Sequence, residues 1–119
     1  MLKRSSTKPD AGHCTFLKLY KIVEGLNKRF PGGDDPFRIL SRLMEETGEL
    51  AQEVHHFEGL KGHRRQDPPD KDHLAKECLD IFTAVLHLAQ HYRIENELSA
   101  RIDEHYRMVI SEGLAEPLE

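Results

Sequence analysis

Acidic side chains occur at helical spacing in two separate segments of this 119-residue chain. In the first segment, Glu46 and Glu49 are three residues apart. In the second segment, Glu77 and Asp80 have the same spacing. Side chains three residues apart lie on one face of an α-helix, where two like charges repel each other by about a few tenths of a kcal/mol. Both pairs therefore indicate a site where a bound cation offsets the repulsion.

The residues around both pairs support this interpretation. No lysine or arginine occurs from residue 45 to residue 54, whereas a surface that served only solubility would mix both signs of charge. The second pair lies in the segment 74–89, which is otherwise mostly apolar. A partly buried carboxylate is unfavourable unless it is paired with a cation or bound to a metal. If the two segments form neighbouring antiparallel helices, the two acidic pairs can face one another.

Four converging carboxylates would suit a hard divalent cation. Mg²⁺ and Mn²⁺ prefer oxygen ligands in octahedral geometry. Zinc is less favoured, because the eight histidines are scattered along the chain and the adjacent His55 and His56 face different directions. The alternative is that these acids form solvated helix faces, as most charged residues do. For Glu45 and Glu53, taken singly, both interpretations stay open.

Four segments have the apolar periodicity of helices and lack the alternation of strands. They cover about 14–30, the chain between Asp35 and Gly59, about 74–92 and about 95–112. In the second segment, Asp35 followed by Pro36 is a helix start signal and Gly59 is a stop signal. The apolar face of this helix consists of Leu40, Leu43, Thr47, Leu50, Val54 and Phe57. We predict an all-α fold with a four-helix bundle-like subunit.

The third predicted helix is apolar over an unusually wide arc. One stripe runs from Leu74 to Tyr92, and a second, adjacent stripe runs from Ala75 to Ala89. A helix of this kind is buried on most sides, so in a chain of this size we expect it also to contact another subunit. The subunit would therefore oligomerise through its central helices. We expect a flexible tail at residues 1–11 and a single domain at residues 12–119.

The composition argues against several other classes of protein. The net charge is −4, without the basic face that a nucleic-acid-binding protein needs. No apolar run approaches the about 18–20 residues that a membrane span requires. A disulfide between Cys14 and Cys78 is conceivable, but two reduced, buried thiols fit the apolar segments around them better. We therefore expect a cytoplasmic protein without nucleic-acid or membrane partners.

The acidic motifs also carry a resemblance to a known family. Glu45-Glu46-x-x-Glu49, followed by Glu77-x-x-Asp80, resembles the signature of the MazG-like all-α nucleotide pyrophosphohydrolases. The segments 41–54 and 74–94 are similar to the second and third helices of that family, and the resemblance extends over about 35–110. The last helix matches loosely, and the chain has no tryptophan.

The resemblance implies a four-helix fold that assembles as a dimer or a dimer of dimers. It implies Mg²⁺, with Mn²⁺ as a substitute, bound by Glu46, Glu49, Glu77 and Asp80. It further implies cleavage of a nucleoside triphosphate between the α- and β-phosphates, in the removal of unwanted nucleotides. Glu45 would join the four ligands as a catalytic residue that orients water or holds a second ion.

One basic cluster lies between the two acidic segments. Lys61, Arg64 and Arg65 could bind the phosphate groups of the substrate, or they could form an ordinary solvated loop. Two other functions stay open for the chain as a whole. One is a phosphoribosyl-ATP pyrophosphatase with the same metal chemistry, and the other is a non-catalytic helical module for dimerisation or partner binding.

Overall fold

Four α-helices make up most of the chain in a computed structural model that describes residues 15–59 and 67–119. They are α1 (Thr15–Arg29), α2 (Pro36–Phe57), α3 (Lys71–His91) and α4 (Glu95–Ser111). No strand occurs in the described ranges. The predicted all-α class and the four helices are thus confirmed. The predicted tail at residues 1–11 lies outside the described residues.

The ends of α2 are set by the predicted local signals. The Asp35 side chain accepts a hydrogen bond from the backbone N–H of Phe37 at 2.9 Å, and Pro36 occupies the first turn. The helix ends at Phe57, and Gly59 follows with a φ of 64°. This left-handed conformation favours glycine because it has no side chain.

The third helix begins earlier than its apolar stripe indicates. Asp70 caps it by accepting a hydrogen bond from the N–H of Asp72 at 2.9 Å, so α3 starts at Lys71 rather than at Leu74. A cap needs only an acceptor side chain before the first turn, and it is independent of apolar periodicity.

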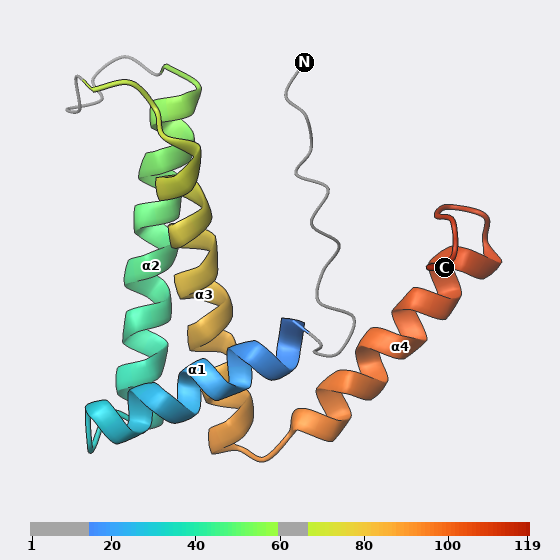
Figure 1. Ribbon diagram of the computed structural model, residues 1–119, viewed down its shortest axis with the longest axis horizontal. Coiled ribbons are helices and arrows are strands. Elements are labelled where there is room, and N and C mark those ends of the chain that lie inside the picture. The colour runs from blue at the N-terminus through green and yellow to red at the C-terminus, as the bar shows by residue number, and fades with distance from the viewer. Residues whose placement is uncertain (1–14, 60–66) are drawn as a thin grey trace.

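Helices α2 and α3 lie side by side and run antiparallel, while α1 crosses near one end of the pair (Figure 1). Helix α3 contacts each of the other three helices. The main apolar cluster joins Leu19 and Val23 of α1 to Leu86 of α3, with Tyr20 and Leu98 packed against it. The antiparallel pairing matters for function, because it brings the two acidic segments next to each other.

Helix α4 leads away from the end of α3 and has no buried residue (Figure 1). The four helices therefore do not close around one shared core within a single subunit. The radius of gyration is 17.4 Å, whereas a compact chain of about 100 residues has a value of about 13 Å. The apolar periodicity of α4 was predicted correctly, but it does not determine which surface covers that face.

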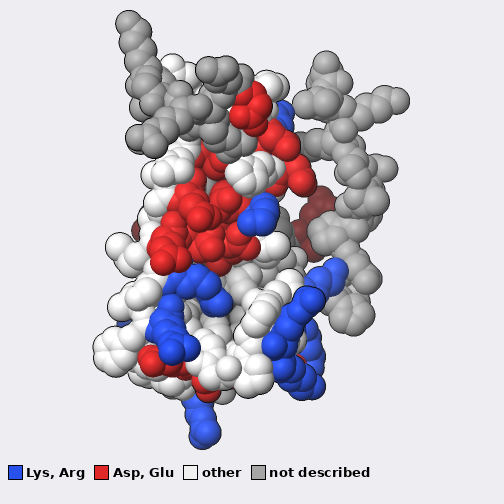
Figure 2. All heavy atoms as spheres, turned by 90° about the vertical axis from the view of Figure 1, so that its left-hand side faces the viewer, with Lys and Arg blue, Asp and Glu red and all other residues white. Residues whose placement is uncertain are grey.

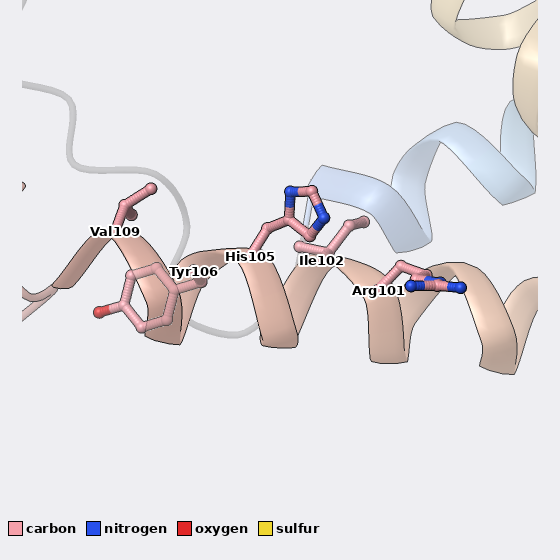
Figure 3. Close-up of a pocket in the computed structure, with 5 residues that line it drawn as sticks. All are labelled: Arg101, Ile102, His105, Tyr106 and Val109. Carbon is pink, nitrogen blue, oxygen red and sulfur yellow. The ribbon is translucent and has the colours of Figure 1, made fainter. Parts of the chain in front are cut away.

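An apolar hollow lies along α4, and the described side chains that line it come from this one helix (Figure 3). They are Arg101, Ile102, His105, Tyr106 and Val109. Among the residues that the structure describes, no second element contributes to this hollow, so they form an open helix surface without convergent polar groups for catalysis. None of the described helices is both long enough and apolar enough to cross a membrane.

Candidate metal centre

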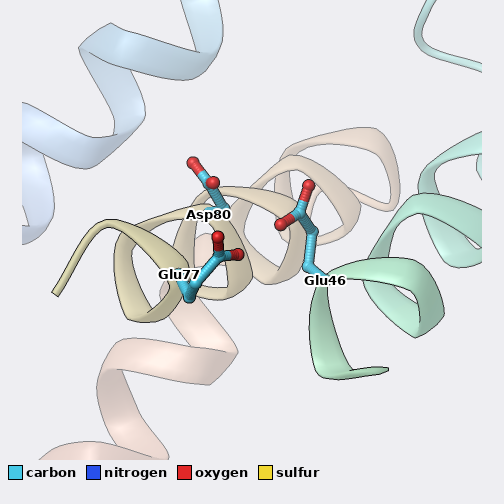
Figure 4. Close-up of side chains that lie close together, drawn as sticks. All are labelled: Glu46, Glu77 and Asp80. Carbon is cyan, nitrogen blue, oxygen red and sulfur yellow. The ribbon is translucent and has the colours of Figure 1, made fainter. Parts of the chain in front are cut away.

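Three carboxylates from two helices converge in the space between α2 and α3 (Figure 4). Glu46 comes from α2, and Glu77 and Asp80 come from successive turns of α3. One carboxylate oxygen from each residue lies within 4.8 Å of the other two. We call these three residues the carboxylate cluster. The antiparallel helix pair thus brings together three of the four residues predicted as metal ligands.

Two oxygens of the cluster are buried without a hydrogen-bond partner among the described residues. They are Oε2 of Glu46 and Oε2 of Glu77, and only 3% of Glu77 as a whole is exposed. An unsatisfied buried carboxylate oxygen is unfavourable, because it loses hydration without gaining a donor. A divalent cation that prefers oxygen ligands would satisfy both atoms, so the residues present fit Mg²⁺ or Mn²⁺.

The negative charges of the cluster influence one another. Burial, together with the charges of Glu49 and Asp80, raises the pKa of Glu46 to about 7. The Lys76 ammonium pairs with the cluster, because its Nζ lies 2.9 Å from Oδ2 of Asp80. Acidic side chains gather on the side of the molecule where α2 and α3 lie (Figure 2). This excess of negative charge favours a cation over an anion at the centre of the cluster.

The other predicted site residues among those described, Glu45 and Glu49, do not belong to the carboxylate cluster. Glu49 is exposed and neighbours Glu46, but its carboxylate is not within the distance that joins the three. Glu45 lines an adjoining groove with Phe37 and other residues of α2, and Arg42 lines both this groove and the cavity beside Glu46 and Asp80. The predicted phosphate-binding residues Lys61, Arg64 and Arg65 lie outside the described residues.

A histidine that the sequence analysis did not select links Glu53 to the cluster. His73 Nδ1 lies 2.8 Å from Oε1 of Glu53, and His73 Nε2 lies 3.4 Å from Oε1 of Glu77. Only 4% of Glu53 is exposed. The available signal was the spacing of four residues between His73 and Glu77, which places both on one face of α3. His73 thus contacts one carboxylate of the cluster and one buried carboxylate outside it.

A second missed pair lies on the other side of the cluster. Nη2 of Arg42 lies 3.1 Å from Nδ1 of His87. His87 is buried, with only 3% of the residue exposed. Burial and the charge of Arg42 lower the pKa of His87. The ring is therefore neutral near pH 7, and Nδ1 accepts the hydrogen bond from the guanidinium. The two residues are 45 positions apart in sequence, so no local spacing could reveal this contact.

The raised pKa of Glu46 predicts that metal binding depends on pH. A cation requires the ionised carboxylate, so below about pH 7 each bound ion must displace a proton. We expect the affinity for Mn²⁺ to rise by up to about tenfold per pH unit as the pH approaches 7, and to level off above it. Electron paramagnetic resonance of free Mn²⁺ at pH 5.5–8 measures this. An affinity that stays constant over the range would contradict the prediction.

Residues 35–108 match the family model described as the MazG nucleotide pyrophosphohydrolase domain. The match covers more than half of the chain and includes both helices that carry the cluster. No curated protein and no solved structure matches the chain.

Proposed function

Because the chain belongs to the MazG nucleotide pyrophosphohydrolase family, and is thus a hydrolase of phosphoric anhydrides, we propose that it cleaves nucleoside triphosphates in a Mg²⁺-dependent reaction. The bond cleaved would join the α- and β-phosphates, and the products would be a nucleoside monophosphate and pyrophosphate. The observation that carries the proposal is the convergence of Glu46, Glu77 and Asp80 within the matched segment. The proposed role is the removal of unwanted nucleotides.

The proposed metal ligands are the three residues of the carboxylate cluster, with Glu49 as a fourth ligand. Glu49 follows Glu46 by one helical turn, and rotation of its exposed side chain could bring it towards the ion. When bound, Mg²⁺ would supply positive charge to the phosphate oxygens and lower the pKa of water. The ligand group found among the described residues contains only carboxylates, which supports a hard cation rather than zinc.

The protein's own contribution would be positioning and charge. Phosphoryl-type transfer needs little covalent chemistry from the enzyme, so no serine or cysteine nucleophile is required. His73, held by the buried Glu53, would keep the Glu77 carboxylate in one orientation. Glu45 stays a proposed residue for orienting the attacking water, reached from the groove beside the cluster.

Product analysis tests this function directly. The purified protein is incubated with Mg²⁺ and a panel of normal and modified NTPs, dNTPs and phosphoribosyl-ATP. We expect monophosphate and pyrophosphate in equal amounts from at least one nucleoside triphosphate. Release of orthophosphate would contradict cleavage between the α- and β-phosphates. Turnover restricted to phosphoribosyl-ATP would favour that alternative substrate, and no turnover together with no metal binding would favour a non-catalytic helical module.

We also propose that the subunit forms a homodimer or homotetramer. Three large apolar side chains of α3, Leu79, Phe82 and Val85, are each at least 40% exposed. The apolar face of α4 is uncovered as well, and the subunit is extended for its length. Burial of these surfaces against further copies would supply the core that one subunit lacks. The proposed location is the cytoplasm, with which the free thiol of Cys78 agrees.

A further inference from the structure

We propose that Arg42 binds the phosphate oxygens of the substrate beside the carboxylate cluster, and that the buried His87 holds its guanidinium in place. This inference rests on the proposed function, since it assumes that a polyphosphate meets a cation at the cluster. It assigns the phosphate-binding role to a residue of α2, whereas the sequence analysis assigned that role to the loop residues Lys61, Arg64 and Arg65.

The first argument is the shared cavity. Arg42 lines a cavity of about 130 Å³ together with Glu46 and Asp80 of the cluster. Leu26 of α1 and Thr83 of α3 complete its lining. Each water in the liquid occupies about 30 Å³, so a cavity of this size has room for several oxygen atoms. A phosphate group held by a cation on the cluster would therefore lie within reach of the guanidinium.

The second argument is that Arg42 keeps its charge available. Within the described part of the chain, no ion pair of 4.0 Å or less joins Arg42 to Glu46 or Asp80, although all three line one cavity. Its described hydrogen-bond partner is a neutral imidazole nitrogen. A guanidinium has five N–H donors, so most of them remain for an anion. Arg42 thus shares a cavity with the carboxylates of Glu46 and Asp80, and a phosphate in this cavity could contact both the guanidinium and a cation on the cluster.

The third argument is that the hydrogen-bond partner of Arg42, His87, is held in a fixed position. His87 is buried on α3 and accepts from Nη2 of Arg42 at 3.1 Å. A donor that is already held in one position loses less conformational entropy when it binds an anion. His87 is therefore a positioning residue, and Arg42 is the residue that would touch substrate.

A matched control lies one turn earlier on the same helix. Arg38 lines the adjoining groove of about 430 Å³ with Phe37, Ser41, Arg42 and Glu45. It does not line the cavity beside the cluster. Replacing Arg38 or Arg42 by methionine removes the same charge and keeps a similar aliphatic stem, so only the position differs.

The test measures binding of Mn²⁺ by electron paramagnetic resonance and binding of inorganic pyrophosphate, in the presence of Mg²⁺, by calorimetry. We expect Arg42→Met to weaken pyrophosphate binding by about 10- to 100-fold. Its Mn²⁺ affinity should not fall, because Arg42 is not a ligand and its positive charge repels a cation in the same cavity. Arg38→Met should change pyrophosphate binding by less than about threefold.

Two further variants test the positioning role and protect against a folding defect. His87→Leu removes the acceptor and should weaken pyrophosphate binding by about fivefold or more, whereas His87→Asn retains an acceptor and should recover most of the loss. Should Arg42→Met fail to fold, Arg42→Lys keeps the charge without the planar fork and should still bind pyrophosphate several-fold more weakly.

The outcomes separate this inference from the proposed function. Wild-type protein that binds neither Mn²⁺ nor pyrophosphate would overturn both. Wild-type protein that binds both, with unchanged pyrophosphate binding in Arg42→Met or Arg42→Lys, would overturn the role of Arg42 alone. Equal losses in Arg38→Met and Arg42→Met would also overturn it, because the effect would then be one of general surface charge.

Discussion

Asp80→Asn is expected to lower Mg²⁺-dependent pyrophosphate release by about a hundred- to a thousandfold while the protein stays folded. The substitution preserves the shape of the side chain but removes one negative charge from the three that converge between α2 and α3. Asparagine is a weaker ligand for a hard cation, so the affinity for Mn²⁺ should fall together with the rate. Turnover and Mn²⁺ binding are measured on the same preparation.

The fold should survive because the local structure around Asp80 does not depend on its charge. The described ion pair of Asp80 is with Lys76, an exposed side chain one turn away on the same helix. Asp72→Asn is the matched control, since it makes the same chemical change at an exposed position in the first turn of α3. Wild-type turnover by Asp80→Asn would refute its assignment as a ligand, and loss of turnover in both variants would point to a general effect on α3.

The sequence predicted those features that depend on local spacing. The apolar periodicity and the Asp35–Pro36 start signal located the helices, and the spacing of three residues placed Glu77 and Asp80 on one face of α3. The antiparallel pairing of α2 and α3 was only assumed as a condition for the acidic pairs to meet, and the structure has this pairing. Local patterns suffice here because each helix satisfies its own backbone hydrogen bonds.

Contacts between helices could not be predicted in the same way. Glu49 was expected among the ligands, yet its carboxylate lies outside the group that Glu46, Glu77 and Asp80 form. The helical spacing places Glu46 and Glu49 on one face, but it does not fix how closely each side chain approaches α3. The contact of Arg42 with His87 joins residues far apart in sequence. The open position of α4 depends on which surfaces cover it, and the helical pattern carries no information about that.

Glu46→Gln is expected to stabilise the metal-free protein while abolishing its response to metal. Burial and the charges of Glu49 and Asp80 raise the pKa of Glu46 to about 7, so ionisation of Glu46 opposes folding. Protonated Glu46 contributes to the free energy of unfolding. This contribution is complete below pH 4.5, the pKa of Glu46 in the unfolded chain, and it is lost as the pH rises through about 7, its pKa in the folded protein. Glutamine is neutral at every pH, and therefore it avoids the loss.

Thermal unfolding at two pH values measures this effect. At pH 8 without metal, we expect the Tm of Glu46→Gln to exceed the wild-type Tm by roughly 2–5 °C, and at pH 5 the difference should shrink. Addition of Mn²⁺ should raise the wild-type Tm, because a ligand that binds only the folded state stabilises it. The variant should respond weakly, and its turnover should fall by about a hundredfold or more.

Glu45→Gln is the control for this experiment, because Glu45 is the adjacent residue and lines a different groove. Its metal-free Tm should change by less than about 1 °C at both pH values. If Glu46→Gln were less stable than the wild type at pH 8 without metal, the cluster would not be a site of unrelieved repulsion. A site that costs stability when empty and recovers it when metal binds is expected where selection acts on catalysis rather than on stability.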